Sequence, residues 1–203
     1  MKILNLYSGI GGNRKFWTPN DNNHDITAIE NNEAIAKIYQ DFFPKDKVIV
    51  ADAHQYLLEH YKEFDFIWSS PPCQSHSSFR KNICVRYRGT KAAYPDIKLY
   101  EEILFLKHHT KNWVVENVKP YYKPLIKPDF VLQRHYFWSD KIIEEKKFKT
   151  DLIRKAQIPD LQEKYGFDLS KYKLKNKRQV LRNCVEPEVG LYILFMFMSI
   201  FEG

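Results

Sequence analysis

Short apolar runs alternate with longer amphipathic stretches over residues 1–118. The apolar runs have the length of strands and read KILNLY at 2–7, ITAIE at 26–30, KVIV at 47–50, FDFIW at 64–68 and WVVENV at 113–118. Helical periodicity between them covers residues 32–42, 54–61 and 96–108. Alternating strands and helices build a parallel sheet with helices on its faces. We therefore predict an α/β fold with a Rossmann-like, doubly wound, mostly parallel sheet.

The pattern changes after residue 118. The stretch DFVLQRHYFWSD at 129–140 alternates aromatic and polar residues and follows three prolines, which predicts an antiparallel strand appendage to the sheet. Short helices are predicted at 151–157 and 160–165. The apolar run LYILFMFMSIF at 191–201 is shorter than the roughly 20 residues that cross a bilayer. We predict that it is a buried helix or strand and that the chain has no membrane span.

The excess of positive charge is confined to one segment. The chain carries a formal net charge of +7, and residues 141–182 hold 13 Lys and Arg against 6 Asp and Glu, which leaves 19 of each sign elsewhere. A concentrated basic patch favours a polyanionic partner, although such a stretch is often only a solvated surface. Charge alone leaves both interpretations open.

Length and cysteine usage limit the class of protein. A chain of 203 residues suits one domain with an appendage. The three cysteines form no CxxC pair, and the sequence MKILNLYSG lacks the layout of a signal peptide. We expect a protein of the reducing cytoplasm.

Three successive strand ends carry residues that suit a nucleotide-like ligand. The first predicted strand runs into Gly9, Gly11 and Gly12, where the backbone can pass close to a ligand before a helix. Glu30 ends the second strand, where a carboxylate can bind ribose hydroxyls, and Asp52 ends the third. Each residue alone has an ordinary explanation as a turn or a helix cap. Together they predict an adenosine-type cofactor at the carboxyl edge of the sheet.

A cysteine follows the fourth predicted strand at the same edge. Pro71 and Pro72 stiffen the loop and fix the direction of Cys73. Buried structural cysteine is the commonest state of this residue, but the polar sequence QSHSS that follows favours an accessible thiol. We predict that Cys73 is a nucleophile.

The motifs LYSGIGG, PPCQ and ENV occur in this order. With them the chain resembles the cytosine-C5 DNA methyltransferases through nearly its whole length. The resemblance implies a class I methyltransferase fold and S-adenosyl-L-methionine as cofactor. It also implies a set of cofactor-binding residues at strand ends and in loops, namely Tyr7, Ser8, Gly9, Gly11, Gly12, Glu30, Asn31, Asp52, Ala53, Pro72, Leu99 and Asn183.

The proposed chemistry needs a nucleophile and an acid. C5 of cytosine is a poor nucleophile, so a thiolate must first add to C6 and push electron density onto C5. Addition is easier when an acid faces N3, and Glu116 ends the next strand. Burial would raise the pKa of this carboxyl and suit it to proton donation. Arg134 in LQRHYFW resembles the basic motif that helps to hold the base and the catalytic loop; alternatively it is an exposed strand residue or a phosphate contact.

The substrate base must be flipped out of a duplex or supplied single-stranded. We expect the long loop 74–95 to close over the base. The predicted DNA contacts lie in this loop and in the basic segment and are Gln74, Ser77, Arg80, Arg86, Arg88, Lys175, Lys177 and Arg178. The resemblance implies double-stranded DNA, with the cytosine flipped out, as the expected partner.

The resemblance divides the chain into a catalytic core at 1–140, a small basic target-recognition insert at 141–182 and a closing element at 183–203. The insert is far shorter than the recognition domain usual in the family, which predicts phosphate binding with strong salt dependence and loose sequence specificity. Departures from the family pattern at Asn5, Asn31 and Arg182, and a single arginine in LQRHYFW, bear mainly on cofactor affinity.

Other functions use parts of the same pattern. A tRNA cytosine-C5 methyltransferase shares the Cys-Glu chemistry, and a silent DNA-binding subunit would need a partner chain for activity. An amino-methylating DNA enzyme has an aromatic residue where Cys73 lies, and an NAD-type oxidoreductase leaves PPCQ and ENV unexplained. No metal is predicted, since the histidines lack ligand spacing. We expect a monomer, with a restriction endonuclease or specificity chain as a possible partner, in the cytoplasm of a prokaryotic or a phage- or virus-infected cell.

Overall fold

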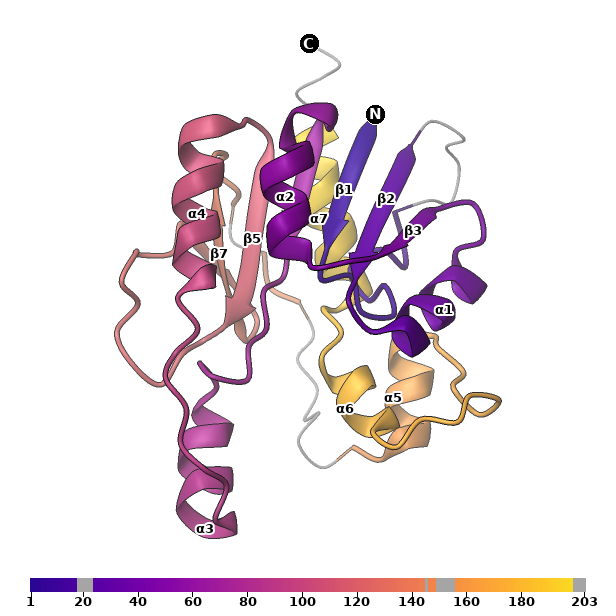
Figure 1. Ribbon diagram of the computed structural model, residues 1–203, viewed down its shortest axis with the longest axis vertical. Coiled ribbons are helices and arrows are strands. Elements are labelled where there is room, and N and C mark those ends of the chain that lie inside the picture. The colour runs from indigo at the N-terminus through magenta and orange to yellow at the C-terminus, as the bar shows by residue number, and fades with distance from the viewer. Residues whose placement is uncertain (18–23, 145, 149–155, 199–203) are drawn as a thin grey trace.

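The computed structural model describes residues 1–17, 24–144, 146–148 and 156–198. These residues form one seven-stranded sheet with the order β3-β2-β1-β4-β5-β7-β6 (Figure 1). Its strands are β1 (Lys2–Leu6), β2 (Asp25–Glu30), β3 (Lys47–Val50), β4 (Phe66–Ser69), β5 (Trp113–Val118), β6 (Phe130–Leu132) and β7 (His135–Ser139). All of the predicted strands are confirmed.

The sheet is parallel from β3 to β5 and antiparallel beyond it. β1 pairs in parallel with β2 and with β4, and β4 pairs in parallel with β5. β7 then runs antiparallel to both β5 and β6. The β6–β7 hairpin turns through Gln133, whose φ of 52° is left-handed. This confirms the predicted α/β class with an antiparallel appendage.

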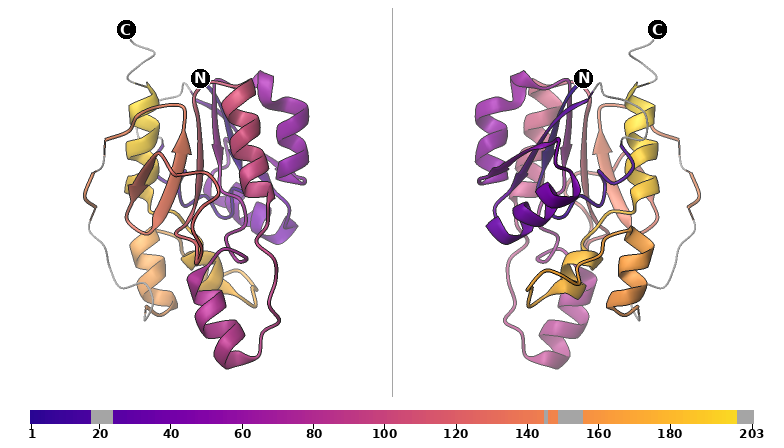
Figure 2. Two further views of the ribbon diagram at one scale, coloured as in Figure 1. Left: turned by 90° about the vertical axis from the view of Figure 1, so that its left-hand side faces the viewer. Right: turned by 90° about the vertical axis from the view of Figure 1, so that its right-hand side faces the viewer.

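Helices cover both faces of the sheet, as the two edge-on views show (Figure 2). The elements between the strands are α1 (Glu33–Phe42), α2 (Ala53–His60), η1 (Tyr61–Glu63), η2 (Arg80–Val85), α3 (Arg86–Arg88) and α4 (Lys98–His109). Two further helices, α5 (Ile158–Tyr165) and α6 (Lys177–Arg182), follow β7, and α7 (Pro187–Met198) ends the described chain. The described part of the C-terminal apolar run, residues 191–198, is therefore helical.

Successive side chains of β1 point to opposite faces of the sheet and pack in two separate hydrophobic clusters. Leu4 and Leu6 are fully buried against α2 and α4, whereas Ile3 packs in the cluster that includes Ile193 of α7. Burying one such side chain stabilises the fold by roughly 1.5–3 kcal/mol. Because both faces are covered, the strand ends are left as the accessible edge of the sheet.

The stretch 74–95, which we expected to be a long loop, contains a helical arm. A π-helix, η2 (Arg80–Val85), continues into α3 (Arg86–Arg88), and the arm projects beyond the carboxyl edge of the sheet (Figure 1). It ends at Gly89, which takes the left-handed conformation of a helix C-cap. The uninterrupted stretch between Cys73 and Gly89, free of glycine and proline, permits this helix.

The basic segment shares a core with the sheet domain. Leu161 and Tyr165 of α5 and Leu181 of α6 are buried in one cluster with Tyr39 of α1. α5 begins at Ile158 with a proline in its first turn, so the predicted helix 160–165 is confirmed. The predicted helix 151–157 falls largely outside the described residues.

Within the described chain, no helix combines the length and the hydropathy of a membrane span.

Candidate active site

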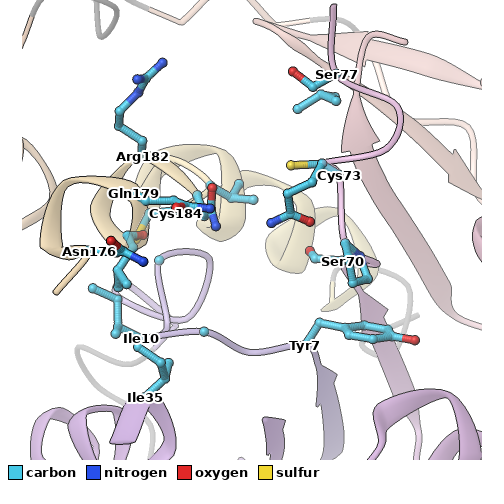
Figure 3. A pocket seen from close by; sticks show the side chains of 18 of the residues that line it. Tyr7, Ile10, Ile35, Ser70, Cys73, Ser77, Asn176, Gln179, Arg182 and Cys184 are labelled. Atoms are coloured by element: carbon cyan, nitrogen blue, oxygen red, sulfur yellow. The ribbon is translucent and has the colours of Figure 1, made fainter. Parts of the chain in front are cut away.

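A cleft of about 930 Å³ lies at the carboxyl ends of β1, β2, β4 and β5. On the opposite side it is lined by α6 and by residues 183–185. Figure 3 shows the Cys73 sulfur pointing into this cleft, towards the wall that carries Gln179 and Cys184. The parallel sheet thus brings sequence-distant strand ends to one cavity.

The turn after β1 forms one end of the cleft. The Gly9 N–H donates to Glu30 Oε2 at 3.1 Å, and the Asn32 N–H donates to Oε1 at 2.9 Å. Burial raises the pKa of Glu30, although these backbone hydrogen bonds oppose the shift. Glu30 is therefore held by backbone amides while it faces the cleft.

Gly12 lies where the C-terminal segment presses against the turn. A Cβ at this position would lie 2.6 Å from Cys184 Cβ and 2.8 Å from the Val185 carbonyl oxygen. Contacts this short require glycine, because the opposing atoms belong to backbone and to a buried side chain. The C-terminal segment therefore fixes the turn from the side opposite the sheet.

The turn has features that fit a small polar ligand. Ser8 is buried, and its Oγ has no hydrogen-bond partner among the described residues. A Cβ added to Gly9 would meet nothing within 4 Å, so space is open beside the backbone there. A buried hydroxyl without a partner is costly unless a ligand or water satisfies it. The turn therefore fits an adenosine-type cofactor.

The Cys73 loop is fixed by its own backbone and by the ENV motif. The N–H groups of His76 and Ser77 donate to the Cys73 carbonyl at 3.1 and 3.0 Å. The Asn117 side chain donates to the Pro71 carbonyl at 2.9 Å and is almost fully buried. Asn117 thus ties the proline segment to β5, next to Glu116.

Glu116 lies buried near the end of β5. The Ser70 hydroxyl hydrogen-bonds to its carboxylate, and Ser70 in turn accepts from Trp68 Nε1 at 2.8 Å. His135 Nε2 lies 3.5 Å from Glu116 Oε1. Burial raises the pKa of Glu116 to about 7, against opposing effects of Ser70 and Arg134. The carboxyl therefore exchanges its proton near neutral pH.

Cys73 and Glu116 affect each other's ionisation. Burial and, to a smaller extent, the Glu116 charge raise the pKa of Cys73 to about 11, against an opposing effect of Arg134. The thiol is half-buried by its surface exposure. In the free protein at neutral pH it is protonated, so it needs deprotonation before it can act as a nucleophile.

Arg134 connects the β6–β7 hairpin to α6 on the other side of the cleft. Its guanidinium donates to the Arg182 carbonyl at 2.9 Å, and its Nε is buried without a partner among the described side chains and backbone. It lines the cleft with Cys73 and Glu116. The three predicted catalytic residues therefore share one cavity.

Most predicted cofactor residues line the cleft, namely Tyr7, Ser8, Gly9, Gly12, Glu30, Asn31, Pro72 and Asn183. Gly11, Asp52, Ala53 and Leu99 do not. Asp52 is an exposed N-cap that accepts from the Gln55 N–H at 3.0 Å, and Ala53 and Leu99 are buried in the core. Gly11 is buried against Phe43.

The predicted nucleic-acid contacts come from two walls. The cleft is lined by Gln74, Ser77, Arg80, Arg88, Lys175, Lys177 and Arg178. Arg86 is exposed on the arm and does not line the cleft. The two basic walls face each other across the cavity that contains Cys73.

Several site residues were not predicted. Ser70 directly precedes PPCQ, Asn117 is the middle residue of ENV, and His135 lies within QRHYFW. Their positions in or beside these motifs could have indicated them. Asn176 and Gln179 line the cleft three residues apart at α6, and helical spacing in NKRQ could have indicated them. No three His, Cys, Asp or Glu side chains gather as a metal site within the described ranges.

Comparison with solved structures places the fold. The methyltransferase EhMeth from Entamoeba histolytica matches with a TM-score of 0.57 and 12% identity, over 99% of this chain and 98% of that one. The fold is that of the α/β-class methyltransferases. A family model for C-5 cytosine-specific DNA methylases matches residues 1–124, more than half of the chain. The chain belongs to this family of cytosine-C5 methyltransferases.

A mutant of DNMT2 from Spodoptera frugiperda is 26% identical over 58% of this chain, with a TM-score of 0.42. The matched part spans 35% of the length of that protein. No curated protein sequence matches the chain.

Proposed function

We propose that the protein transfers a methyl group from S-adenosyl-L-methionine to C5 of cytosine in DNA. The observation that carries the proposal is the placement of the Cys73 thiol and the buried Glu116 carboxyl in one cleft with the glycine turn. Membership of the cytosine-C5 methylase family supports the same chemistry. Tyr7, Ser8, Gly9 and Glu30 would hold the cofactor, which supplies an electrophilic methyl group when bound.

Cys73 and Glu116 would act on opposite edges of the pyrimidine. The Cys73 thiolate forms a bond to C6, while Glu116 donates its proton to N3 and the C5–C6 electron pair becomes nucleophilic at C5. After C5 has gained the methyl group, the C5 proton passes to water, the C5–C6 double bond forms again as the bond to sulfur breaks, and the N3 proton returns to Glu116, which leaves 5-methylcytosine and the Cys73 thiolate. Arg134 favours the Cys73 thiolate, since it lowers the pKa of the thiol, and burial outweighs its opposing effect on the pKa of Glu116.

The charges around the cleft support a nucleic-acid substrate. Residues 74–95 contain five Lys and Arg and no Asp or Glu. Lys175, Lys177 and Arg178 lie on the facing wall. Lys and Arg side chains placed in this way contact phosphates rather than bases. Affinity for DNA should therefore fall steeply as the salt concentration rises. A monomer, and a specificity or endonuclease partner, stay predictions.

The test is covalent trapping on 5-fluorocytosine. Fluorine at C5 does not leave as a proton does, so the adduct between Cys73 and C6 persists after methyl transfer. Purified protein is mixed with tritiated cofactor and a 5-fluorocytosine duplex, and the denatured product is resolved by electrophoresis. We expect a labelled adduct with wild type and none with Cys73→Ser.

Cys84→Ser is the matched control, because Cys84 is also half-buried and lines the same cleft. We expect it to keep the adduct. An adduct with fluorinated tRNA but not with DNA would contradict the DNA assignment and favour the tRNA enzyme. Absence of an adduct with either nucleic acid would contradict autonomous catalysis and favour a subunit that needs a partner.

A further inference from the structure

A buried carboxylate behind the cleft connects the two loops that carry the proposed chemistry. Glu102 of α4 is 1% exposed, although glutamate is almost never fully buried without partners. Its side chain accepts hydrogen bonds from Tyr7, Ser69 and His54. These partners come from the turn after β1, from β4 and from α2, so one carboxylate joins three parts of the fold.

Both carboxylate oxygens of Glu102 are used. Oε1 lies 2.5 Å from the Tyr7 hydroxyl and 2.9 Å from His54 Nδ1, and Oε2 lies 2.6 Å from the Ser69 hydroxyl. A carboxylate only accepts, so all three groups donate and His54 carries its proton on Nδ1. The hydrogen bond to Glu102 is the main cause that raises the pKa of His54.

Tyr7 and Ser69 each lie directly before a loop that lines the cleft. Tyr7 directly precedes the Ser8–Gly9 turn and has a left-handed φ of 54°, an unfavourable conformation for a bulky residue. In Figure 3 its ring is directed away from Ile10 and Ile35 on the other side of the cleft. The hydroxyl contact with Glu102 therefore holds the ring behind the cleft and the backbone in the turn.

Ser69 is the last residue of β4 and precedes the Ser70–Pro71–Pro72 segment that leads to Cys73. It also pairs with Leu6 in the parallel ladder, directly beside the end of β1. A second polar contact from α4 reaches the same loop, because the Tyr100 hydroxyl donates to the Tyr122 hydroxyl, which lies 2.6 Å from His76 Nδ1. α4 thus supports both the cofactor turn and the cysteine loop.

We propose that Glu102 is a positioning residue that fixes the cofactor turn through Tyr7 and the catalytic loop through Ser69. It thereby holds the methyl donor and the Cys73 nucleophile at a fixed position relative to each other. This rests on the proposed function. Glutamine at position 102 has one acceptor oxygen and one amide donor, so it cannot accept from all three partners.

The experiment separates the two contacts. Binding of S-adenosylhomocysteine is measured by calorimetry, and the rate of adduct formation on 5-fluorocytosine DNA is measured at saturating cofactor. Tyr7→Phe should weaken binding roughly tenfold, the effect of losing one hydrogen bond to a charged acceptor, and leave the adduct rate within about twofold. Ser69→Ala should slow adduct formation roughly tenfold and leave binding of S-adenosylhomocysteine within about twofold of wild type. Glu102→Gln should change both quantities.

Glu101→Gln is the matched control, since Glu101 is adjacent on α4 and also contacts His54, at 3.5 Å, but is 57% exposed. We expect it to match wild type in both measurements. Wild-type values for both Tyr7→Phe and Ser69→Ala, or equal losses of binding and rate in each, would overturn the positioning role even if Glu102→Gln fails to fold. If wild type binds no S-adenosylhomocysteine and forms no adduct, the proposed function itself fails.

Discussion

Replacing the buried acid Glu116 by glutamine should stabilise the protein at alkaline pH while it abolishes methyl transfer. Glutamine has nearly the shape of a protonated glutamic acid but carries no charge at any pH. The carboxyl is 7% exposed, and burial raises its pKa from 4.5 to about 7. Charging this group in the folded state therefore costs free energy that the unfolded chain does not expend.

The magnitude follows from linkage. Between pH 4.5 and about 7 the folded protein keeps a proton that the unfolded chain has lost, so stability is highest below this window and falls as pH rises through it. A shift of this size corresponds to about 3 kcal/mol, a large part of an ordinary folding free energy. Among the groups facing Glu116, Arg134 stays charged, Cys73 stays protonated, and burial and nearby cations keep the pKa of His135 well below its usual range. Arg134 and Cys73 therefore add nothing within the window. His135 contributes with the opposite sign, since the unfolded chain protonates this imidazole below its ordinary pKa of 6.5 and the folded protein does not, and wild type and variant share this contribution.

Urea unfolding of wild type and Glu116→Gln from pH 4.5 to pH 8.5 provides the assay. The free energies of unfolding should agree at the acid end, and the variant should exceed wild type by about 3 kcal/mol at the alkaline end. Titrations common to both proteins cancel in the difference. A difference that stays flat with pH would refute the assignment of a desolvated carboxyl at position 116. Glu101→Gln, on an exposed side chain, should give such a flat line.

Three further perturbations test neighbouring parts of the site. Arg134→Gln removes the charge that lowers the pKa of Cys73, so alkylation of Cys73 by iodoacetamide at a fixed pH of about 8.5, followed by mass spectrometry, should slow, and an unchanged rate would contradict this. Asn117→Ala leaves the Pro71 carbonyl without its side-chain donor and should cost about 1–3 kcal/mol in urea unfolding; a loss well below this range would show that the contact is dispensable. Replacing Lys175 and Lys177 by glutamine should reduce the slope of log affinity for DNA against log salt by roughly 0.9 per lost phosphate contact, whereas Lys62→Gln, on η1, should leave the slope unchanged.

The sequence predicted the sheet and the meeting of its key residues because both depend on short-range patterns. Apolar runs located the strands, and the carboxyl ends of parallel strands lie at one edge, so Gly9, Cys73 and Glu116 had to be neighbours. The fold class and the reactive side chains could therefore be predicted from the sequence alone.

The supporting contacts were not predictable in this way. Tyr7 and Glu102 are 95 positions apart, and no local pattern indicates that a hydroxyl at one position meets a carboxylate at the other. Asp52 shows the opposite difficulty, since its position at a strand end suits a ligand contact but its side chain caps α2. The arm at 78–88 was missed because its helix depends on an uninterrupted polar and basic stretch rather than on an apolar stripe.

The mutual effect of Cys73 and Glu116 gives the proposed reaction a built-in dependence on substrate. Burial and the Glu116 charge both raise the pKa of the thiol, so the resting protein holds Cys73 protonated and poorly reactive. A cytosine that accepts a hydrogen bond at N3 would keep Glu116 protonated and so remove the second of these two effects. The thiolate would then form more readily once a base occupies the cleft than in the free protein. Arg134, in the β6–β7 turn, lowers the pKa of Cys73 and so favours the thiolate in the same step, whereas its effect on the pKa of Glu116 acts in the opposite direction.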